Sequence, residues 1–259
     1  MKPWHSLEGK SVWVIGGAGH LGAPITEALD GLCQKTVCLD LEDRAGALVR
    51  EKKLTRTVPE PLDVMAVGPL PGRLEELVAR HGVPDGVVHL ATASSGGKSL
   101  EELSPDEFQS TFDRSLTPNF VLCRTLAERM KPRGSGSIVL FASMYGVVSP
   151  DPRIYHRPMV PNPIDYGAAK AAVIQMTRYL AVHYGPAGVR FNCVTPGPFP
   201  NPGIQKANPA FMGDLDRKVP LGRIGQNHEV VGPTLFLLGD GASYVTGHSL
   251  AVDGGWTIW

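Results

Sequence analysis

The chain has 259 residues, of which 42% are apolar and 19% are charged, and its 25 basic side chains are balanced by 25 acidic ones. This length corresponds to one large domain or two small ones, with enough apolar residues for a substantial core. A formal net charge of zero gives no electrostatic reason to expect binding to nucleic acid or to an anionic membrane. No apolar run has the length of a membrane span, and residues 1–10 lack an apolar signal core, so we expect a cytoplasmic protein.

Short β-rich runs alternate with longer helical stretches along the chain. Strands are expected at residues 11–15, 36–39, 54–58, 86–90, 137–141, 189–194 and 249–252, the third being the weakest. Helices are expected at residues 20–29, 73–80, 105–130, 166–184 and 228–238.

The expected strands are mostly apolar throughout, which indicates a sheet buried on both faces. Their alternation with helices indicates parallel pairing, and no repeat or linker divides the chain. We therefore predict a single doubly wound α/β domain over residues 1–259, with a parallel sheet of about seven strands flanked by helices. In such sheets ligands bind beyond the carboxyl ends of the strands.

The four cysteines are scattered, and none forms a C-x-x-C pair. This spacing favours buried small side chains over a disulfide framework or a zinc site, and no metal site is expected. The residues concerned are Cys33, Cys38, Cys123 and Cys193.

A glycine-rich loop, Gly16-Gly17-Ala18-Gly19-His20-Leu21-Gly22, lies between the first expected strand and the first expected helix. Glycines let the backbone turn tightly and approach a pyrophosphate, and the helix N-terminus supplies N–H donors. A tight strand-to-helix turn alone also needs glycine, but the position after the first strand favours a dinucleotide site.

Asp40 ends the second expected strand. An acidic residue there accepts hydrogen bonds from an adenosine ribose diol and repels a 2′-phosphate, which favours NAD over NADP. Arg44 is near enough to keep NADP open, and an exposed strand-end aspartate is the simpler alternative.

Tyr166 and Lys170 are four residues apart in an expected helix and so share one face. Free tyrosine has a pKa of about 10, and a nearby ammonium lowers it by favouring the phenolate. Such a pair could exchange a proton with an alcohol near neutral pH. A chance pair on a surface helix would explain the spacing equally well, but Ser143 follows a strand at the same sheet end and could hydrogen-bond a substrate oxygen.

Several segments, in order along nearly the whole chain, resemble the short-chain dehydrogenase/reductase family in its short, single-domain branch, which has a Rossmann-type fold. Within the family the sequence looks closest to members with a long insert before the tyrosine, some of them associated with sugar and flagellin-glycan metabolism. Besides the glycine loop and Asp40, the resemblance rests on LDV (62–64), GSGSIVLFAS (134–143), YGAAKAAV (166–173), RFNCVTPG (190–197) and YVTGHSLAVDGG (244–255).

The resemblance implies a role for each site residue. Tyr166 would be the acid/base, Lys170 would lower its pKa and hold the nicotinamide ribose, and Ser143 would orient the reacting oxygen. Asp63 and Val64 would line the adenine, and the backbone of Phe199 would meet the carboxamide. The complete expected cofactor set is Gly16, Gly19, His20, Leu21, Gly22, Asp40, Asp63, Val64, Ala91, Tyr166, Lys170, Pro196, Gly197 and Phe199.

The sequence departs from the family pattern at three places. Ile15 replaces the usual threonine before the glycine loop, and residues 89–92 read His-Leu-Ala-Thr instead of Asn-Asn-Ala-Gly, so that Thr92 would crowd the cofactor. The asparagine that commonly holds a proton-relay water aligns with Ser115, and Asn119 lies one turn later as an alternative.

Between Ser143 and Tyr166 the chain is longer than in typical relatives, and the extra residues are about 150–163. Five prolines stiffen this insert, which would form a wall of the active site. Its Arg153, His156 and Arg157 could bind an anionic substrate group, because arginine suits carboxylates and phosphates; a solvated loop is the alternative. Residues 198–220 correspond to the family's mobile substrate lid.

The leading hypothesis is an NAD(H)-dependent oxidoreductase that interconverts a secondary alcohol and a ketone, with a sugar, polyol or sugar acid as the small-molecule substrate. Alternatives are a nucleotide-sugar epimerase or dehydratase and a non-catalytic NAD-binding protein. The C-terminal residues 252–259 are largely apolar and contain two tryptophans, which we do not expect to be left in water. Relatives commonly form tetramers through this region, so a homotetramer is expected.

Overall fold

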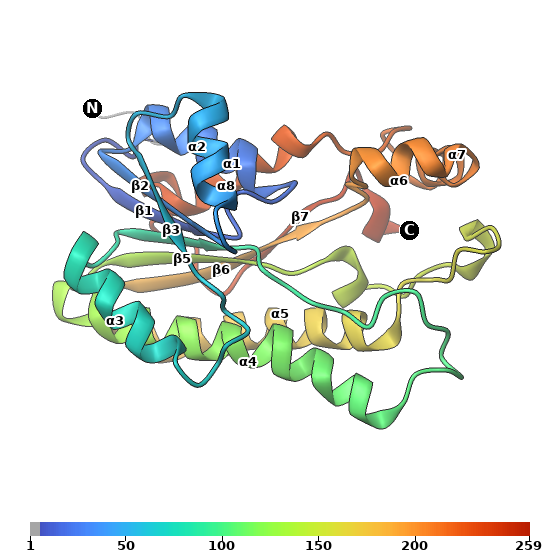
Figure 1. Ribbon diagram of the computed structural model, residues 1–259, viewed down its shortest axis with the longest axis horizontal. Coiled ribbons are helices and arrows are strands. Elements are labelled where there is room, and N and C mark those ends of the chain that lie inside the picture. Colours follow the sequence, from blue (N-terminus) through green and yellow to red (C-terminus); the bar gives the residue numbers. More distant parts are fainter. Residues whose placement is uncertain (1–5) are drawn as a thin grey trace.

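The computed structural model describes residues 6–259, whose seven strands form one parallel sheet in the order β3-β2-β1-β4-β5-β6-β7. The order reverses between β1 and β4, so the crevice at this point, beyond the carboxyl ends of the strands, is where a doubly wound sheet binds its ligand. The predicted α/β class and parallel seven-stranded sheet are confirmed (Figure 1).

The strands lie close to their predicted positions. They are β1 Ser11–Ile15, β2 Lys35–Asp40, β3 Thr57–Pro61, β4 Gly86–His89, β5 Gly136–Phe141, β6 Val189–Pro196 and β7 Ser249–Val252. Only the third differs clearly, because it begins three residues later than predicted. It contains Pro59 and Pro61, and it lies at the sheet edge, where a missing N–H donor is tolerated.

The helices include three that the sequence did not predict, namely α2, α6 and α7. The full set is α1 Gly22–Leu32, α2 Arg44–Lys52, α3 Leu70–His81, α4 Pro105–Met130, α5 Ile164–Tyr184, α6 Pro202–Ala207, α7 Pro209–Lys218 and α8 Val231–Leu238. None of the helices within residues 6–259 is both long and apolar enough to cross a membrane.

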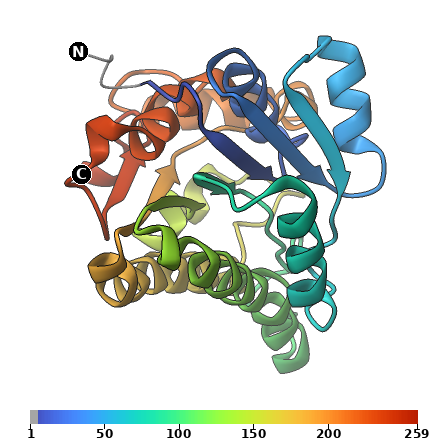
Figure 2. The same ribbon diagram turned by 90° about the vertical axis from the view of Figure 1, so that its left-hand side faces the viewer.

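Helices cover both faces of the sheet, with α1, α2 and α8 on one side and α3, α4 and α5 on the other (Figures 1 and 2). Alternate residues of β1 serve the two layers. Val12 and Val14 pack in the cluster that contains α1 and α8 residues, whereas Trp13 and Ile15 pack with residues of α3, α4 and α5. Burial on both faces explains why the strands are apolar throughout.

All four cysteines are buried and free, as predicted. Residues 1–5, on which part of the expectation of no signal segment rests, lie outside the described residues.

Candidate active site

The glycine loop forms a tight cradle between β1 and α1. Gly16 has φ +77°, a left-handed conformation that favours glycine. A Cβ atom on Gly22 would lie 2.1 Å from the carbonyl oxygen of Gly16. Thr26 Oγ1 fixes the turn by donating a hydrogen bond of 2.9 Å to the Gly17 carbonyl. Gly22 must therefore be glycine because the backbone of Gly16 lies so close to it, and this holds independently of any ligand.

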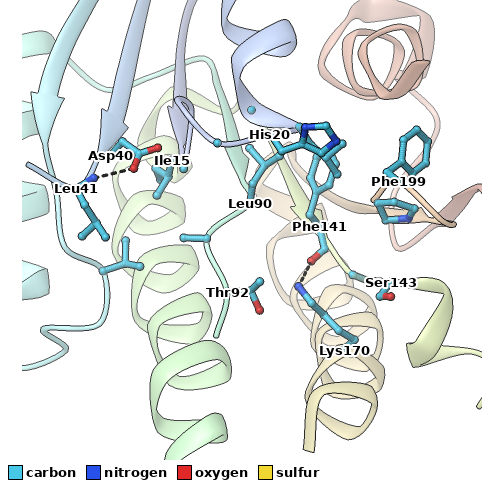
Figure 3. A pocket seen from close by; sticks show the side chains of 18 of the residues that line it. Ile15, His20, Asp40, Leu41, Leu90, Thr92, Phe141, Ser143, Lys170 and Phe199 are labelled. Atoms are coloured by element: carbon cyan, nitrogen blue, oxygen red, sulfur yellow. Dashed lines mark hydrogen bonds between the residues drawn. The ribbon is translucent and has the colours of Figure 1, made fainter. Parts of the chain in front are cut away.

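Asp40, at the end of β2, is buried and linked to the glycine loop. Its carboxylate accepts hydrogen bonds from the N–H groups of Ala18 (2.9 Å) and Leu41 (2.8 Å) and lies 3.2 Å from Arg44 Nη1. The alternative of an exposed strand-end aspartate is therefore excluded. Figure 3 shows the carboxylate at the edge of the crevice.

One cavity of about 430 Å³ lies at the carboxyl ends of the strands. Every residue that was expected at the cofactor lines it, and so does Ser143. Thr92, expected to crowd the cofactor, also lines it. Further lining residues that the sequence did not assign include Leu41, Met65, Leu90 and Phe141.

Tyr166 and Lys170 project from the first turns of α5 toward this cavity. Lys170 Nζ lies 5.6 Å from the centre of the Tyr166 ring and donates a 2.8 Å hydrogen bond to the Phe141 carbonyl (Figure 3). Burial lowers the pKa of Lys170 to about 8. The ammonium is thus held in place by the end of β5.

The pKa of Tyr166 is raised, not lowered as the neighbouring ammonium alone predicted. Burial of the phenol raises the pKa and a hydrogen bond with Ser143 opposes this, but burial is the larger effect. At neutral pH the Tyr166 hydroxyl therefore carries its proton and can donate it to a carbonyl oxygen.

A second cavity, of about 310 Å³, adjoins the first and shares Ser143, Tyr166, Gly197 and Phe199 with it. Its remaining walls come from residues 96–97, from Met144 and Tyr145, from the insert and from the lid with α6 and α7. The insert and lid pack together in a buried cluster that includes Ile154, Phe211 and Leu215. In Figure 1 the two segments lie near each other at the carboxyl ends of the strands.

The structure places the three predicted anion-binding residues outside this second cavity. The Arg153 side chain is 85% exposed and pairs with Asp151. His156 pairs with Asp214 of α7, and Arg157 is exposed. None of the three lines the cavity, because the insert directs its charged side chains to its outer side.

The relay candidates Ser115 and Asn119 are buried in α4 and bonded within that helix. Ser115 Oγ donates to the Thr111 carbonyl at 2.6 Å, and Asn119 Nδ2 donates to the Ser115 carbonyl. Neither residue lines either cavity. The structure therefore does not bring them to the site.

Asp165, which the sequence reasoning missed, lies directly before Tyr166 and is fully buried. Its carboxylate accepts hydrogen bonds from Ser95 N (3.0 Å), Ser95 Oγ (2.9 Å) and Thr111 Oγ1. Burial acts to raise the pKa of Asp165, but these hydrogen bonds hold it below its ordinary value. Asp165 thus anchors the loop before α4 to the start of α5. The sequence shows an acidic residue in the first turn of this helix, which is a favourable position for it. Its hydrogen-bond partners lie 54 and 70 residues away in sequence, so the anchoring role was not visible there.

Comparisons with known proteins agree over nearly the whole chain. A family model described as Enoyl-(Acyl carrier protein) reductase matches residues 21–257. The 2,5-dichloro-2,5-cyclohexadiene-1,4-diol dehydrogenase of Sphingobium indicum is 32% identical over 255 residues, which cover 97% of this chain and 98% of that protein.

Two solved structures are also similar. A short chain dehydrogenase from Leptospira borgpetersenii with bound NAD+ is 30% identical, with a TM-score of 0.87, over 99% of this chain and 96% of that chain. A gluconate 5-dehydrogenase from Burkholderia cenocepacia in complex with NADP and tartrate shares the fold, with a TM-score of 0.87 and 24% identity, over 99% of this chain and 98% of that chain.

These matches span nearly the whole chain, as the motifs in the sequence do. The cavity also lies where a doubly wound sheet binds its ligand. The chain belongs to the short-chain dehydrogenase/reductase family and is a nicotinamide-dependent oxidoreductase of its single-domain branch.

Proposed function

We propose that the protein interconverts a secondary alcohol and a ketone with NAD(H), using Tyr166 as the group that exchanges the proton. One observation carries this proposal: Ser143, Tyr166 and Lys170 line the same cavity as the glycine cradle. A cofactor in the first cavity and a substrate in the adjoining one would therefore meet at Tyr166 and Ser143, which line both.

The residues of the first cavity fit a dinucleotide. The cradle carries no side chain at Gly16, Gly19 and Gly22, which line the cavity, so the backbone there can approach a pyrophosphate closely. Bound NAD supplies or accepts the hydride. The buried Asp40 carboxylate supports NAD over NADP because it would repel a 2′-phosphate, while the half-exposed Arg44 beside it is the group that NADP would use.

The proton chemistry belongs to the chain's own residues. In ketone reduction the Tyr166 hydroxyl donates its proton to the carbonyl oxygen, and in alcohol oxidation the phenolate accepts a proton from the hydroxyl. Ser143 orients that oxygen. Lys170 gives one hydrogen to the Phe141 carbonyl and retains two for ribose hydroxyls, while its charge stabilises the phenolate.

The diol substrate in the name of the Sphingobium relative supports a hydroxyl-bearing carbon as the reaction centre. We also propose a cytoplasmic homotetramer. Trp256 is buried by its own chain and so needs no partner to leave water, whereas Ile258 and Trp259 are each 78% exposed. Two such side chains together support an interface near the C-terminus.

The substitution Tyr166→Phe tests the proposal, with Tyr179→Phe as the matched control, since Tyr179 is an exposed tyrosine of the same helix. Tyr166→Phe should lower kcat by on the order of 10²–10⁴-fold and leave the Kd for NADH nearly unchanged, whereas Tyr179→Phe should alter neither. Unchanged turnover in Tyr166→Phe would exclude the assignment. Binding of NADH without turnover of any alcohol or ketone by the wild type would favour a non-catalytic protein.

A further inference from the structure

Among residues 6–259, no charged side chain lines the second cavity. Its walls are apolar and aromatic, formed largely by Met144, Met159, Phe199, Phe211 and Leu215. An anionic substrate group would lose its hydration there without gaining a counter-ion, which is costly. The cavity therefore disfavours sugar acids and phosphorylated sugars.

The charged residues around this cavity are used to join its two walls. Lys218 Nζ lies 2.7 Å from Asp151, and His156 pairs with Asp214, so the insert is bonded to α7 at two points. These ion pairs lie outside the cavity, and through them Asp151 and His156 join the insert to α7.

The polar side chains that line the cavity are Asn162 of the insert and two pairs. Ser143 and Tyr166 make up the first. The second is the pair Tyr145 and Tyr155, whose hydroxyl oxygens are 2.7 Å apart. One of the two hydroxyl hydrogens bridges this pair, and no hydrogen bond among the described residues uses the other. The pair can therefore donate one hydrogen bond to a ligand.

Packing holds the Tyr145 and Tyr155 side chains in position to donate this hydrogen bond. The Tyr155 ring packs on Phe211 of α7 with the ring centres 5.0 Å apart, and Tyr145 is buried. Burial raises the pKa of Tyr145, so its hydroxyl stays neutral. A neutral oxygen on the substrate is the matching partner, whereas a polyol with many hydroxyls would carry more of them than the cavity has polar side chains to pair.

We propose that this cavity selects a neutral secondary alcohol or ketone with an apolar body and a second oxygen, which the Tyr145–Tyr155 pair binds while Ser143 and Tyr166 hold the reacting oxygen. This inference rests on the proposed function, whose Tyr166 defines the reacting end. The sequence analysis named a sugar, polyol or sugar acid as the substrate, and this inference narrows the choice to a compact diol or hydroxyketone.

The test compares kcat/KM for cis-1,4-cyclohexanediol, cyclohexanol and D-gluconate with NAD. We expect the diol to exceed cyclohexanol by about tenfold, the worth of one hydrogen bond, and gluconate to be at least about a hundredfold poorer because its charge is buried unpaired. Tyr155→Phe should reduce the diol-to-cyclohexanol ratio to about one. Arg153→Gln, in the same insert but outside the cavity, should leave the ratio unchanged. Circular dichroism and the Kd for NADH check that each variant is folded.

Turnover of gluconate comparable to the diol, or a ratio insensitive to Tyr155→Phe, would overturn the inference and leave the proposed function intact. Absence of turnover on every substrate would instead count against the proposed function. In that case titration calorimetry of the NADH complex with 4-hydroxycyclohexanone and cyclohexanone still decides the inference. Tighter binding of the hydroxyketone, lost in Tyr155→Phe, supports it, and equal binding contradicts it.

Discussion

Tyr166 and Lys170 are affected in opposite senses by the same environment. Burial raises the pKa of the phenol and lowers that of the ammonium to about 8, because it disfavours the charged form of each. The sequence predicted that these side chains are neighbours but gave the opposite direction for the tyrosine. The spacing of two residues on a helix shows their proximity, whereas desolvation depends on how β5 and the loops cover them.

The pH dependence of the two reaction directions should differ for this reason. Oxidation needs the Tyr166 phenolate, so its kcat/KM should rise with pH from about 7 into the alkaline range. Reduction needs the phenol, so its kcat/KM should stay level through neutral pH and fall only in the alkaline range. Initial rates in both directions across a buffer series measure this. A rate of oxidation that falls between about pH 7 and pH 9 would contradict the raised pKa.

Asp165 contributes stability through its buried hydrogen bonds. Replacing it by alanine leaves the donors of Ser95 and Thr111 unpaired, which should cost about 3 kcal/mol of unfolding free energy. Asp113→Ala, which removes an exposed carboxylate of α4, should cost less than about 0.5 kcal/mol. The pKa of Asp165 is depressed, so its contribution is present above about pH 4 and is lost as pH falls further. Urea unfolding at neutral and acidic pH measures both effects, and equal losses in the two variants would refute the assignment.

Local start signals were used for the long helix α4 but overlooked in the segment after β6. Helix α4 begins as expected because Ser104 and Glu107 form a capping box. The sequence reasoning treated residues 198–220 as a lid rich in loop-forming residues and missed α6 and α7. Asn201, whose side chain accepts from Ile204 N at 3.0 Å, and the proline that follows it were usable start signals.

Two glycines of α1 make a matched pair for the loop-to-helix junction. Gly22→Ala should weaken NADH binding at least about tenfold and destabilise the fold by about 1–3 kcal/mol, because its Cβ would lie 2.1 Å from the Gly16 carbonyl oxygen. Gly31→Ala meets no atom within 4 Å and should stabilise the fold by about 0.5–1 kcal/mol with unchanged NADH affinity. Thermal unfolding and NADH fluorescence titration check both. Normal NADH affinity in Gly22→Ala would show that the loop does not approach the cofactor closely.

At the scale of the whole molecule, the sequence predicts the first cavity, where the cofactor is expected, better than the adjoining second cavity. The residues expected at the cofactor follow successive strands, and a parallel sheet brings those ends together, so the glycine loop, Asp40 and Lys170 meet in one cavity. The adjoining cavity depends on pairs such as Asp151–Lys218 and His156–Asp214, which are 67 and 58 residues apart and have no periodic signal. Of the three insert residues assigned to the substrate, His156 instead pairs with Asp214 of α7 and Arg153 with Asp151 of the insert itself. Arg157 is exposed.

The most direct test of the account is the fate of the hydride in wild-type protein. With an accepted alcohol deuterated at the carbinol carbon and excess NAD, we predict one equivalent of ketone per NADH formed, with the deuterium on the nicotinamide ring. Conversion of the alcohol to a stereoisomer or dehydrated product with no net NADH would contradict the account and indicate an epimerase or dehydratase instead.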